Sequence, residues 1–357
     1  MRRRIVADGT SVLAALLVVV SARAATSAPR EDVLERYPVC EASAALEVPC
    51  AGDARGACVW VADDEQDAEL FAYDVEEGGR LVPREAWRIA LRGARVDDVE
   101  ALARDGEDVL VLGSHGRDST CRPRPGRAAV ARVAVDDSAV SPLASGARWQ
   151  ERLARCEGEL IEPSSDAAGG ELRRAVCAAI SAAERAADEA ASGGRPCPGD
   201  AFNVEGAAAV PGNGGPRVWL GLRGPLVGDD RAILLRLVPG IVREGNVAFD
   251  GVAAVDLGGR GIRELSFADG FVWGIAGSVE DGARPSRLWR MPASLLRDGA
   301  VVAEVETLSD ALPPTAEALV VQPGKRRAIV LVDGDTSKRK TRCAEPARQM
   351  VVPLPLP

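Results

Sequence analysis

The segment EGAAAVPGNGGPRVWLG, residues 205–221, decides the fold. It consists of a Glu, a run of small and apolar residues, a turn rich in Gly and Pro, and a second apolar run. Short apolar runs bounded by Gly, Pro and Asn are typical of β-strands joined by turns. The segment therefore predicts two consecutive strands, the first beginning beside Glu205.

The same pattern occurs five times along the chain. Its leading residues are Glu41, Glu100, Glu205, Glu264 and Glu317. Each is followed by a second apolar run, and third and fourth runs are visible in most units. Four short strands in repeated units of roughly 50 to 60 residues are typical of propeller blades. We therefore predict an all-β fold, a β-propeller of five to six four-stranded blades, with tandem β-domains as the alternative. A sixth blade would lie in the irregular middle of the chain or be completed by pairing of the two termini.

One region departs from the repeat. Residues 149–160 and 171–191 are rich in Ala, Glu, Arg and Leu, which favours helices, and Gly pairs bracket the second run. We predict an α-helical hairpin inserted at residues 148–194, covering one end of the propeller. Trp60, Trp219 and Trp273 occupy equivalent second strands and are expected in the blade core.

The N-terminus resembles a secretory signal. Arg2, Arg3 and Arg4 precede an uncharged apolar run, and Ala22-Arg23-Ala24 has small residues where a signal peptidase cleaves. We expect a signal peptide at residues 1–24, a linker at 25–39, and the propeller at 40–357; an uncleaved anchor is the alternative. The expected location is periplasmic or secreted, with no stable membrane insertion after cleavage.

Cysteine content agrees with export. The eight cysteines are an even number, and disulfides persist in oxidising compartments. No C-x-x-C pair occurs and the chain has one His, so a zinc site is disfavoured. A hypothesis for the pairing places each bridge on the predicted strands and helices. It joins Cys50 to Cys58, Cys121 to Cys197, Cys156 to Cys177, and Cys40 to Cys343.

The chain is acidic, with a formal net charge of −9. Binding to nucleic acid or anionic lipid needs a basic surface, so we expect no nucleic-acid partner. The charge suits cations or basic partners, although it also serves solubility alone.

These residues also resemble a known family. The runs at residues 40–44, 61–65, 113–117, 203–206, 221–225 and 256–263 are similar, in order, to motifs of the bacterial family known as domain of unknown function 3616. The resemblance covers roughly residues 40–335 and implies a propeller fold without an established activity. More distantly, the chain is similar to esterase-like and phytase-like propellers, some of which bind calcium; that link is an analogy of fold.

Familiar catalytic motifs are missing. The sequence has no G-x-S-x-G elbow, no Walker-type loop and no G-x-G-x-x-G motif after a strand. His115 is therefore the one candidate for a catalytic histidine, and a structural role is equally compatible with the sequence. Ser114 is a poor nucleophile partner for it, because neighbours on a strand point to opposite faces.

The recurrent Glu suggests a ligand site instead. The first strand of each blade lines the central channel, so equivalent residues would form a ring. Clustered carboxylates must be protonated, paired with Arg or bound to a cation, and calcium prefers such oxygen ligands. The expected ligand and metal residues are Glu41, Glu100, Glu205 and Glu317, with Asp63 and Asp64 as further metal ligands. The alternative is that each carboxylate only accepts hydrogen bonds from backbone N–H groups of a neighbouring blade.

Arginines and His115 complete the predicted site. Arg117 and Arg223 end equivalent strands and would bind an anion, and Arg223, Arg260 and Arg263 would neutralise the ring. We therefore expect a binding or interaction module for an unidentified small molecule or protein, with calcium as its candidate ion. The alternatives are a calcium-dependent phosphoester or ester hydrolase and a protein-binding scaffold.

Overall fold

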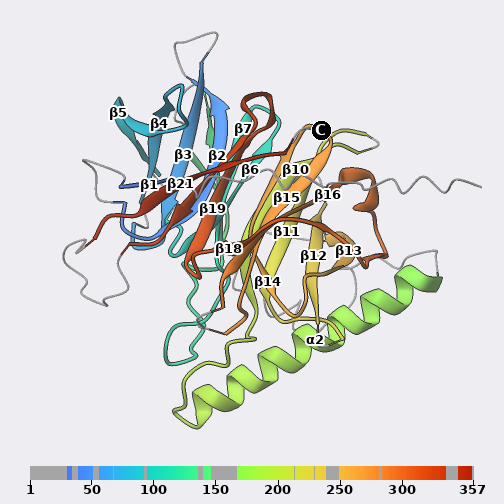
Figure 1. The fold of residues 1–357 in the computed structure, drawn as a ribbon. Coiled ribbons are helices and arrows are strands. Elements are labelled where there is room, and N and C mark those ends of the chain that lie inside the picture. The colour runs from blue at the N-terminus through green and yellow to red at the C-terminus, as the bar shows by residue number, and fades with distance from the viewer. Residues whose placement is uncertain are drawn as a thin grey trace, which may run out of the picture.

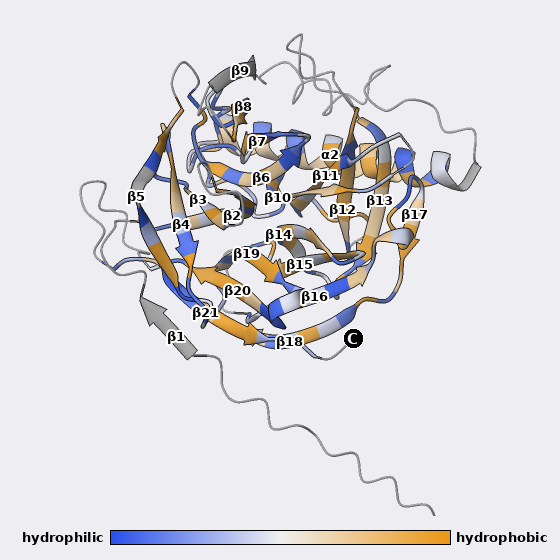
Figure 2. Ribbon diagram, turned by 90° about the horizontal axis from the view of Figure 1, so that it is seen from above, coloured by the Kyte–Doolittle hydropathy of each residue, from blue (hydrophilic) through white to orange (hydrophobic). Residues whose placement is uncertain are grey.

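The computed structural model describes residues 30–33, 39–50, 56–66, 68–91, 95–135, 140–145, 167–212, 214–228, 230–238, 249–280, 284–334 and 345–355. Within them the chain forms five sheets arranged radially around one channel, as Figure 2 shows from above. The innermost strands contact one another in the closed order β2, β6, β10, β14, β19 and back to β2. The predicted propeller is thus confirmed, with five blades.

The blades follow the predicted repeat (Figure 1). Blade 1 contains β2 (Ala42–Pro49), β3 (Ala57–Asp63), β4 (Glu69–Val75) and β5 (Leu81–Ala90). Blade 2 contains β6 (Val99–Asp105), β7 (Asp108–Gly113), β8 (Ala129–Ala134) and β9 (Val140–Ser145). Blade 4 contains β14 (Gly261–Ala268), β15 (Phe271–Gly277), β16 (Ser286–Pro292) and β18 (Glu306–Leu312).

Blade 3 has five strands rather than the predicted four. It contains β10 (Asn203–Val210), β11 (Arg217–Gly224), β12 (Arg231–Leu237), β13 (Phe249–Asp256) and β17 (Ala300–Val302). The connection between β16 and β18 leaves blade 4 and adds β17 to β13 in parallel. The buried side chains of Ala300 and Val302 pack with the blade 3 and blade 4 core, which explains this excursion.

Both chain ends contribute to blade 5. From the channel outward it contains β19 (Ala316–Gln322), β20 (Arg327–Val332), β21 (Arg348–Pro353) and β1 (Arg30–Val33). Strand β1 is antiparallel to β21, with Arg30 opposite Val351. The expected pairing of the termini therefore completes the fifth blade and not a sixth. Part of residues 25–39, expected as a linker, supplies this strand.

Apolar packing between neighbouring sheets holds the ring together. Trp60, Trp219 and Trp273 are buried, which confirms them as blade core. Gly206 shows how closely the inner strands approach: a Cβ added there would lie 2.8 Å from the backbone nitrogen of Leu265 on the next blade. A glycine is required at such a contact, because any side chain would separate the two strands.

One helix, α2 (Ala167–Ser192), packs against the propeller. Its buried residues Leu172, Val176 and Ile180 recur every four positions and join the core of blades 2 and 3. Arg173 of the helix pairs with Asp298 at 2.6 Å. The predicted second helix at 149–160 lies outside the described residues, so the hairpin itself stays a prediction. None of the described helices has the length and apolar character needed to cross a membrane.

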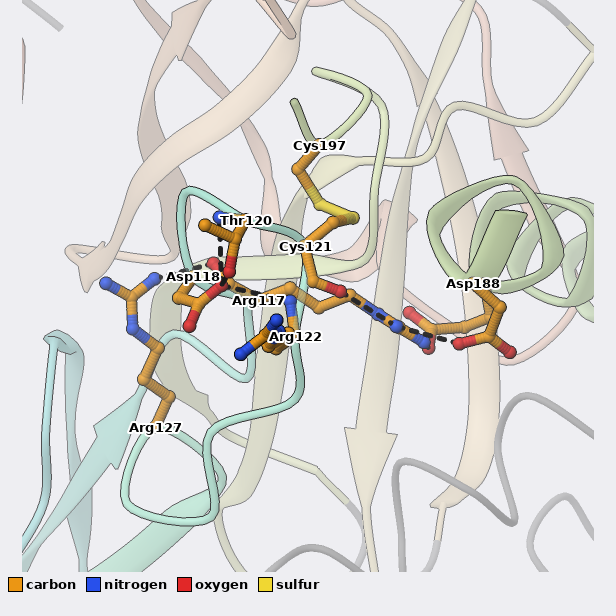
Figure 3. Close-up of a disulfide and its surroundings, with 9 residues drawn as sticks. Arg117, Asp118, Thr120, Cys121, Arg122, Arg127, Asp188 and Cys197 are labelled. Carbon is orange, nitrogen blue, oxygen red and sulfur yellow. Dashed lines mark hydrogen bonds and ion pairs between the residues drawn. A yellow bond between two sulfur atoms is a disulfide. The ribbon is translucent and has the colours of Figure 1, made fainter. Parts of the chain in front are cut away.

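Disulfides fix loops at both ends of the propeller. Cys50 pairs with Cys58, and Cys121 pairs with Cys197, as expected. Figure 3 shows the second bridge beside α2 and Arg117. Cys40 and Cys177 are also disulfide-bonded. Their expected partners, Cys343 and Cys156, lie outside the described residues.

Candidate functional site

Each inner strand carries a β-bulge near its first residues. The pairing of β6 with β7 skips Glu100, and that of β10 with β11 skips Glu205. The corresponding skips fall at Ser43 in β2, Arg263 in β14 and Glu317 in β19. A bulge re-aims the unpaired residue, and five equivalent bulges make a ring at one mouth of the channel. This bulge ring consists of Ser43, Glu100, Glu205, Arg263 and Glu317.

The bulge ring contains three of the five predicted carboxylates. Glu41 lies two residues before its bulge, so its structural equivalent in blade 2 is Asp98 and not Glu100. Glu264 lies one residue after its bulge at Arg263. A bulge shifts the pairing register of the strand by one residue. Aligning the repeats on their Glu residues does not reveal where each bulge lies, so it misplaces Glu41 and Glu264 relative to the other three.

Arg263 neutralises the side of the bulge ring made by blades 3 to 5. Its Nε lies 2.9 Å from Glu205 Oε2, and its Nη2 forms an ion pair with Glu317. Arg223 Nη1 donates to Glu205 Oε1 at 3.1 Å, and Asn203 Nδ2 donates to the same oxygen at 2.8 Å. Glu205, 3 % exposed, and Glu317 are therefore paired carboxylates. Arg223 and Arg263, both expected from the sequence to neutralise the carboxylates, make these ion pairs.

The side made by blades 1 and 2 is acidic. Carboxylate oxygens of Asp64, Asp98 and Glu100 all lie within 4.8 Å of one another. Asp64 follows the last residue of β3, and Asp98 immediately precedes β6. The backbone of Asp98 is left-handed, with φ 58°, a conformation that Asp and Asn tolerate better than most residues. We call these three residues the acidic trio.

Burial makes the carboxyls of the acidic trio harder to ionise than isolated ones. Burial raises the pKa of Asp64 to about 10, assisted by a hydrogen bond and repulsion from Glu41. Burial also raises the pKa of Glu100 well above its ordinary value, and neighbouring carboxylates add to the effect. For Asp98 burial again dominates, although Arg127 Nη2, 3.2 Å from Asp98 Oδ1, favours the charged form. Three carboxyls this close share protons or a cation.

Asp333 completes the acidic side and was missed from the sequence. It follows β20 at the position where Asp64 follows β3, as the pairings beside the two bulges show. Burial raises its pKa well above the ordinary value, Arg263 opposes this, and Glu41 reinforces it. The signal that could have found it is an acidic residue directly after the second strand of the last unit.

Asp63 accepts backbone hydrogen bonds and is not part of the acidic trio. Its Oδ2 accepts the backbone N–H of Cys40 at 2.7 Å, and its Oδ1 accepts that of Glu65 at 3.1 Å. Burial nevertheless raises its pKa to about 6. Asp63 thus organises the loops around the acidic trio, and its own oxygens are occupied by these backbone donors.

Glu264 lies deeper in the channel. Its Oε1 accepts the backbone N–H of Leu265 at 2.8 Å, and its Oε2 accepts that of Ala45 at 3.2 Å. Burial raises its pKa well above the ordinary value. It matches the structural alternative considered for the recurrent Glu.

The remaining predicted residues lie elsewhere. His115 is fully buried with φ 56°, and burial holds its pKa well below the ordinary value, so the imidazole is neutral. Arg117 forms ion pairs with two residues of α2, Glu184 at 2.6 Å and Asp188 at 2.8 Å (Figure 3). Its guanidinium group, expected to bind an anionic ligand, therefore binds these two carboxylates. The described residues form no ion pair between Arg260 and the bulge ring.

Comparison with known proteins finds a family match over part of the chain. Residues 196–345 match the family described as Protein of unknown function (DUF3616), which confirms the resemblance in the second half of the chain. No curated protein matches the sequence.

Solved structures similar to this chain include three from bacteria. Hydrazine synthase of Kuenenia stuttgartiensis is 10 % identical over 88 % of this chain and 58 % of its own, with a TM-score of 0.34. Regucalcin of Agrobacterium tumefaciens, a calcium-binding protein, is 11 % identical over 93 % and 96 %, with a TM-score of 0.36. A putative glucose dehydrogenase of Thermus thermophilus is 13 % identical over 91 % and 100 %, with a TM-score of 0.42. The chain spans less than two thirds of the first of these proteins. Sequence identity and TM-scores this low give no information on which ligand this chain binds or which reaction it catalyses.

Proposed function

We propose that this chain, whose residues 196–345 match the DUF3616 family, is a binding propeller whose acidic mouth holds a divalent cation. The supporting observation is the acidic trio, whose carboxylate oxygens from two blades lie within 4.8 Å of one another. Calcium takes six to eight oxygen ligands, and the trio supplies carboxylates of that chemistry. Glu41 and Asp333 stand beside it as further oxygen donors.

The charge pattern around the trio supports this proposal. Arg263 and Arg223 serve the paired carboxylates Glu205 and Glu317 on the opposite side of the mouth. Among the described residues the trio has an ion pair only with Arg127, at Asp98, so its three carboxyls outnumber the cations beside them, and burial makes this excess costly. A bound cation would remove this cost by displacing the shared protons.

We place this binding module outside the cytoplasm, in the periplasm or secreted. Its disulfides suit an oxidising compartment, where millimolar calcium sites are typical of extracellular modules.

Calorimetric titration of the disulfide-intact protein, stripped with chelator and measured at pH 8, tests the cation site. We expect saturable calcium binding that Asp98→Asn weakens at least tenfold. Asp269→Asn is a matched control, because Asp269 is exposed, has φ 54° and lies at the other end of β14. Asn tolerates the left-handed backbone at both positions, so neither substitution strains the turn. Absence of saturable binding, or equal binding by the Asp98 variant, would contradict the proposal.

The alternative of a calcium-dependent phosphoester or ester hydrolase uses the same ion. The feature that favours it is the buried carboxyl of Asp333 on the acidic side of the mouth, because burial raises its pKa in the direction that a general acid needs. A panel of phosphate and carboxylate esters, assayed with calcium and with Glu100→Gln as control, tests it. Turnover that disappears in the variant would establish an enzyme, whereas calcium binding without turnover would leave the binding module.

A further inference from the structure

Three arginines gather at the seam between blades 3 and 4. Arg260 directly precedes β14, and Arg284 and Arg287 lie at the start of β16. Both connections leave the strands at the end of the propeller that carries the bulge ring, because β14 begins there and β15 ends there. We call these three residues the arginine cluster.

Two of the guanidinium groups converge over one glycine. A Cβ added at Gly258 would lie 3.6 Å from Arg287 Nη1 and 3.8 Å from Arg260 Nη1. Gly258 has φ 66°, and its N–H donates to Asp256 Oδ1 at 2.9 Å, which fixes the turn. Both guanidinium groups therefore reach one small volume that the missing side chain leaves open.

Within the described residues, the arginine cluster lacks a compensating acid. No ion pair or hydrogen bond joins Arg260, Arg284 or Arg287 to a described carboxylate, and the Nε atoms of Arg260 and Arg287 are buried without a hydrogen-bond partner. Asp256 and Glu304 line the neighbouring hollow without pairing to them. Burial lowers the pKa of Arg260, and repulsion from Arg287 and Arg284 adds to this. Placing three guanidinium groups near one another costs electrostatic free energy unless an anion binds between them.

A hollow adjoins the cluster. It has a volume of about 310 Å³ and lies between blades 3 and 4, lined by Gly258, Arg287, Trp289 and Thr307 among others. The indole Nε1 of Trp289, a residue only 1 % exposed, is also buried without a hydrogen-bond partner. The hollow is large enough for a small molecule that carries one anionic group.

We propose that the arginine cluster binds the phosphate group of a small ligand, such as a phosphomonoester, whose remainder occupies the adjoining hollow. Arg guanidinium groups present forked N–H donors that match phosphate oxygens, and two of them converging on one point suit a dianion. This site is separate from the acidic trio and does not depend on a cation there.

Titration with inorganic phosphate tests the site, by calorimetry and by the melting temperature at constant ionic strength. We expect saturable binding and a melting temperature that rises with phosphate concentration. Arg287→Ala should weaken binding at least tenfold, and Arg287→Lys should weaken it less because the charge remains while the fork is lost. Phenyl phosphate should bind more tightly than inorganic phosphate if the hollow holds the remainder of the ligand.

Arg297→Ala is the matched control. Arg297 is exposed and precedes β17, which runs parallel to β13, so it lies at the opposite end of the same seam. Without phosphate, Arg287→Ala should be at least as stable as the unaltered protein, because it removes repulsion; this separates loss of binding from loss of folding. No phosphate-dependent shift, equal weakening by Arg297→Ala, or tighter binding of malonate than of phosphate would overturn the assignment.

Discussion

The carboxylate of Glu264 accepts the backbone N–H of Ala45 across the channel, at 3.2 Å, although 219 residues separate the two in sequence. Ala45 belongs to β2 in blade 1 and Glu264 to β14 in blade 4, and these inner strands are not neighbours in the ring. The bond therefore spans the channel below the bulge ring. It links blades 1 and 4, whose strands share no backbone hydrogen bonds.

Removing this cross-channel acceptor should destabilise the protein. Glu264→Ala leaves buried N–H donors without a partner, which costs about 1–3 kcal/mol for each. Glu264→Gln keeps one acceptor oxygen and should cost less. The raised pKa of Glu264 means that its contribution to stability is full below the unfolded pKa and is lost as pH rises through the folded pKa. Urea unfolding from pH 5 to pH 8 should therefore show a decline that is shallower in Glu264→Gln; equal slopes would contradict this.

Calcium affinity should rise with pH. The pKa of Asp64 is raised to about 10, so its proton must leave before the oxygen can bind a cation. Each proton displaced changes the affinity by up to about tenfold per pH unit below that pKa. Calorimetry at pH 6, 7 and 8, in buffers of different ionisation enthalpy, measures both affinity and proton release. Affinity that does not vary with pH would show that Asp64 is not a ligand.

Arg263 should be essential to the bulge ring. It contacts both Glu205 and Glu317, so Arg263→Met leaves two buried carboxylates without this cation. Breaking a buried pair by removing one partner costs about 3–5 kcal/mol. Adding Glu205→Gln and Glu317→Gln to the variant should restore much of the lost stability, as a denaturation midpoint will show. A triple variant no more stable than Arg263→Met would indicate that Arg263 acts through packing alone.

The two described disulfides should differ in their contributions. Cys121 and Cys197 are 76 residues apart, whereas Cys50 and Cys58 are 8 residues apart. Chain-entropy arguments give about 4.5 kcal/mol for the long loop and about 2.5 kcal/mol for the short one. Replacing each pair by Ser and measuring urea midpoints compares them directly. A larger loss from the short loop would point to native-state packing and not to loop closure.

Much of the fold follows from the sequence because propeller strands are short, apolar and repeated. The second strands, the buried Trp60, Trp219 and Trp273, and the helix near residues 171–191 could all be predicted. The strand at Ala300–Val302 could not be assigned to a blade from the sequence, because its pairing with β13 of another blade depends on tertiary packing. The same holds for the assignment of β1 to blade 5.

The site was predicted less completely. A repeated Glu located the mouth, but bulges set which residue turns inward, so Ser43 and Arg263 occupy positions expected for Glu41 and Glu264. Arg117 was expected to meet a ligand, and α2 supplies Glu184 and Asp188 to it instead. Such partners come from segments distant in sequence, and spacing within one repeat does not reveal them.

The antiparallel pairing of β1 with β21 makes blade 5 a latch between the segment that precedes blade 1 and the segment that follows β20. This pairing cannot form until Arg348–Pro353 has been synthesised, so the ring of sheets stays open until that point of translation. Loss of either terminal strand would unfasten the same seam. A circular permutant that links the two ends and opens a surface turn elsewhere would keep the latch intact within one continuous hairpin.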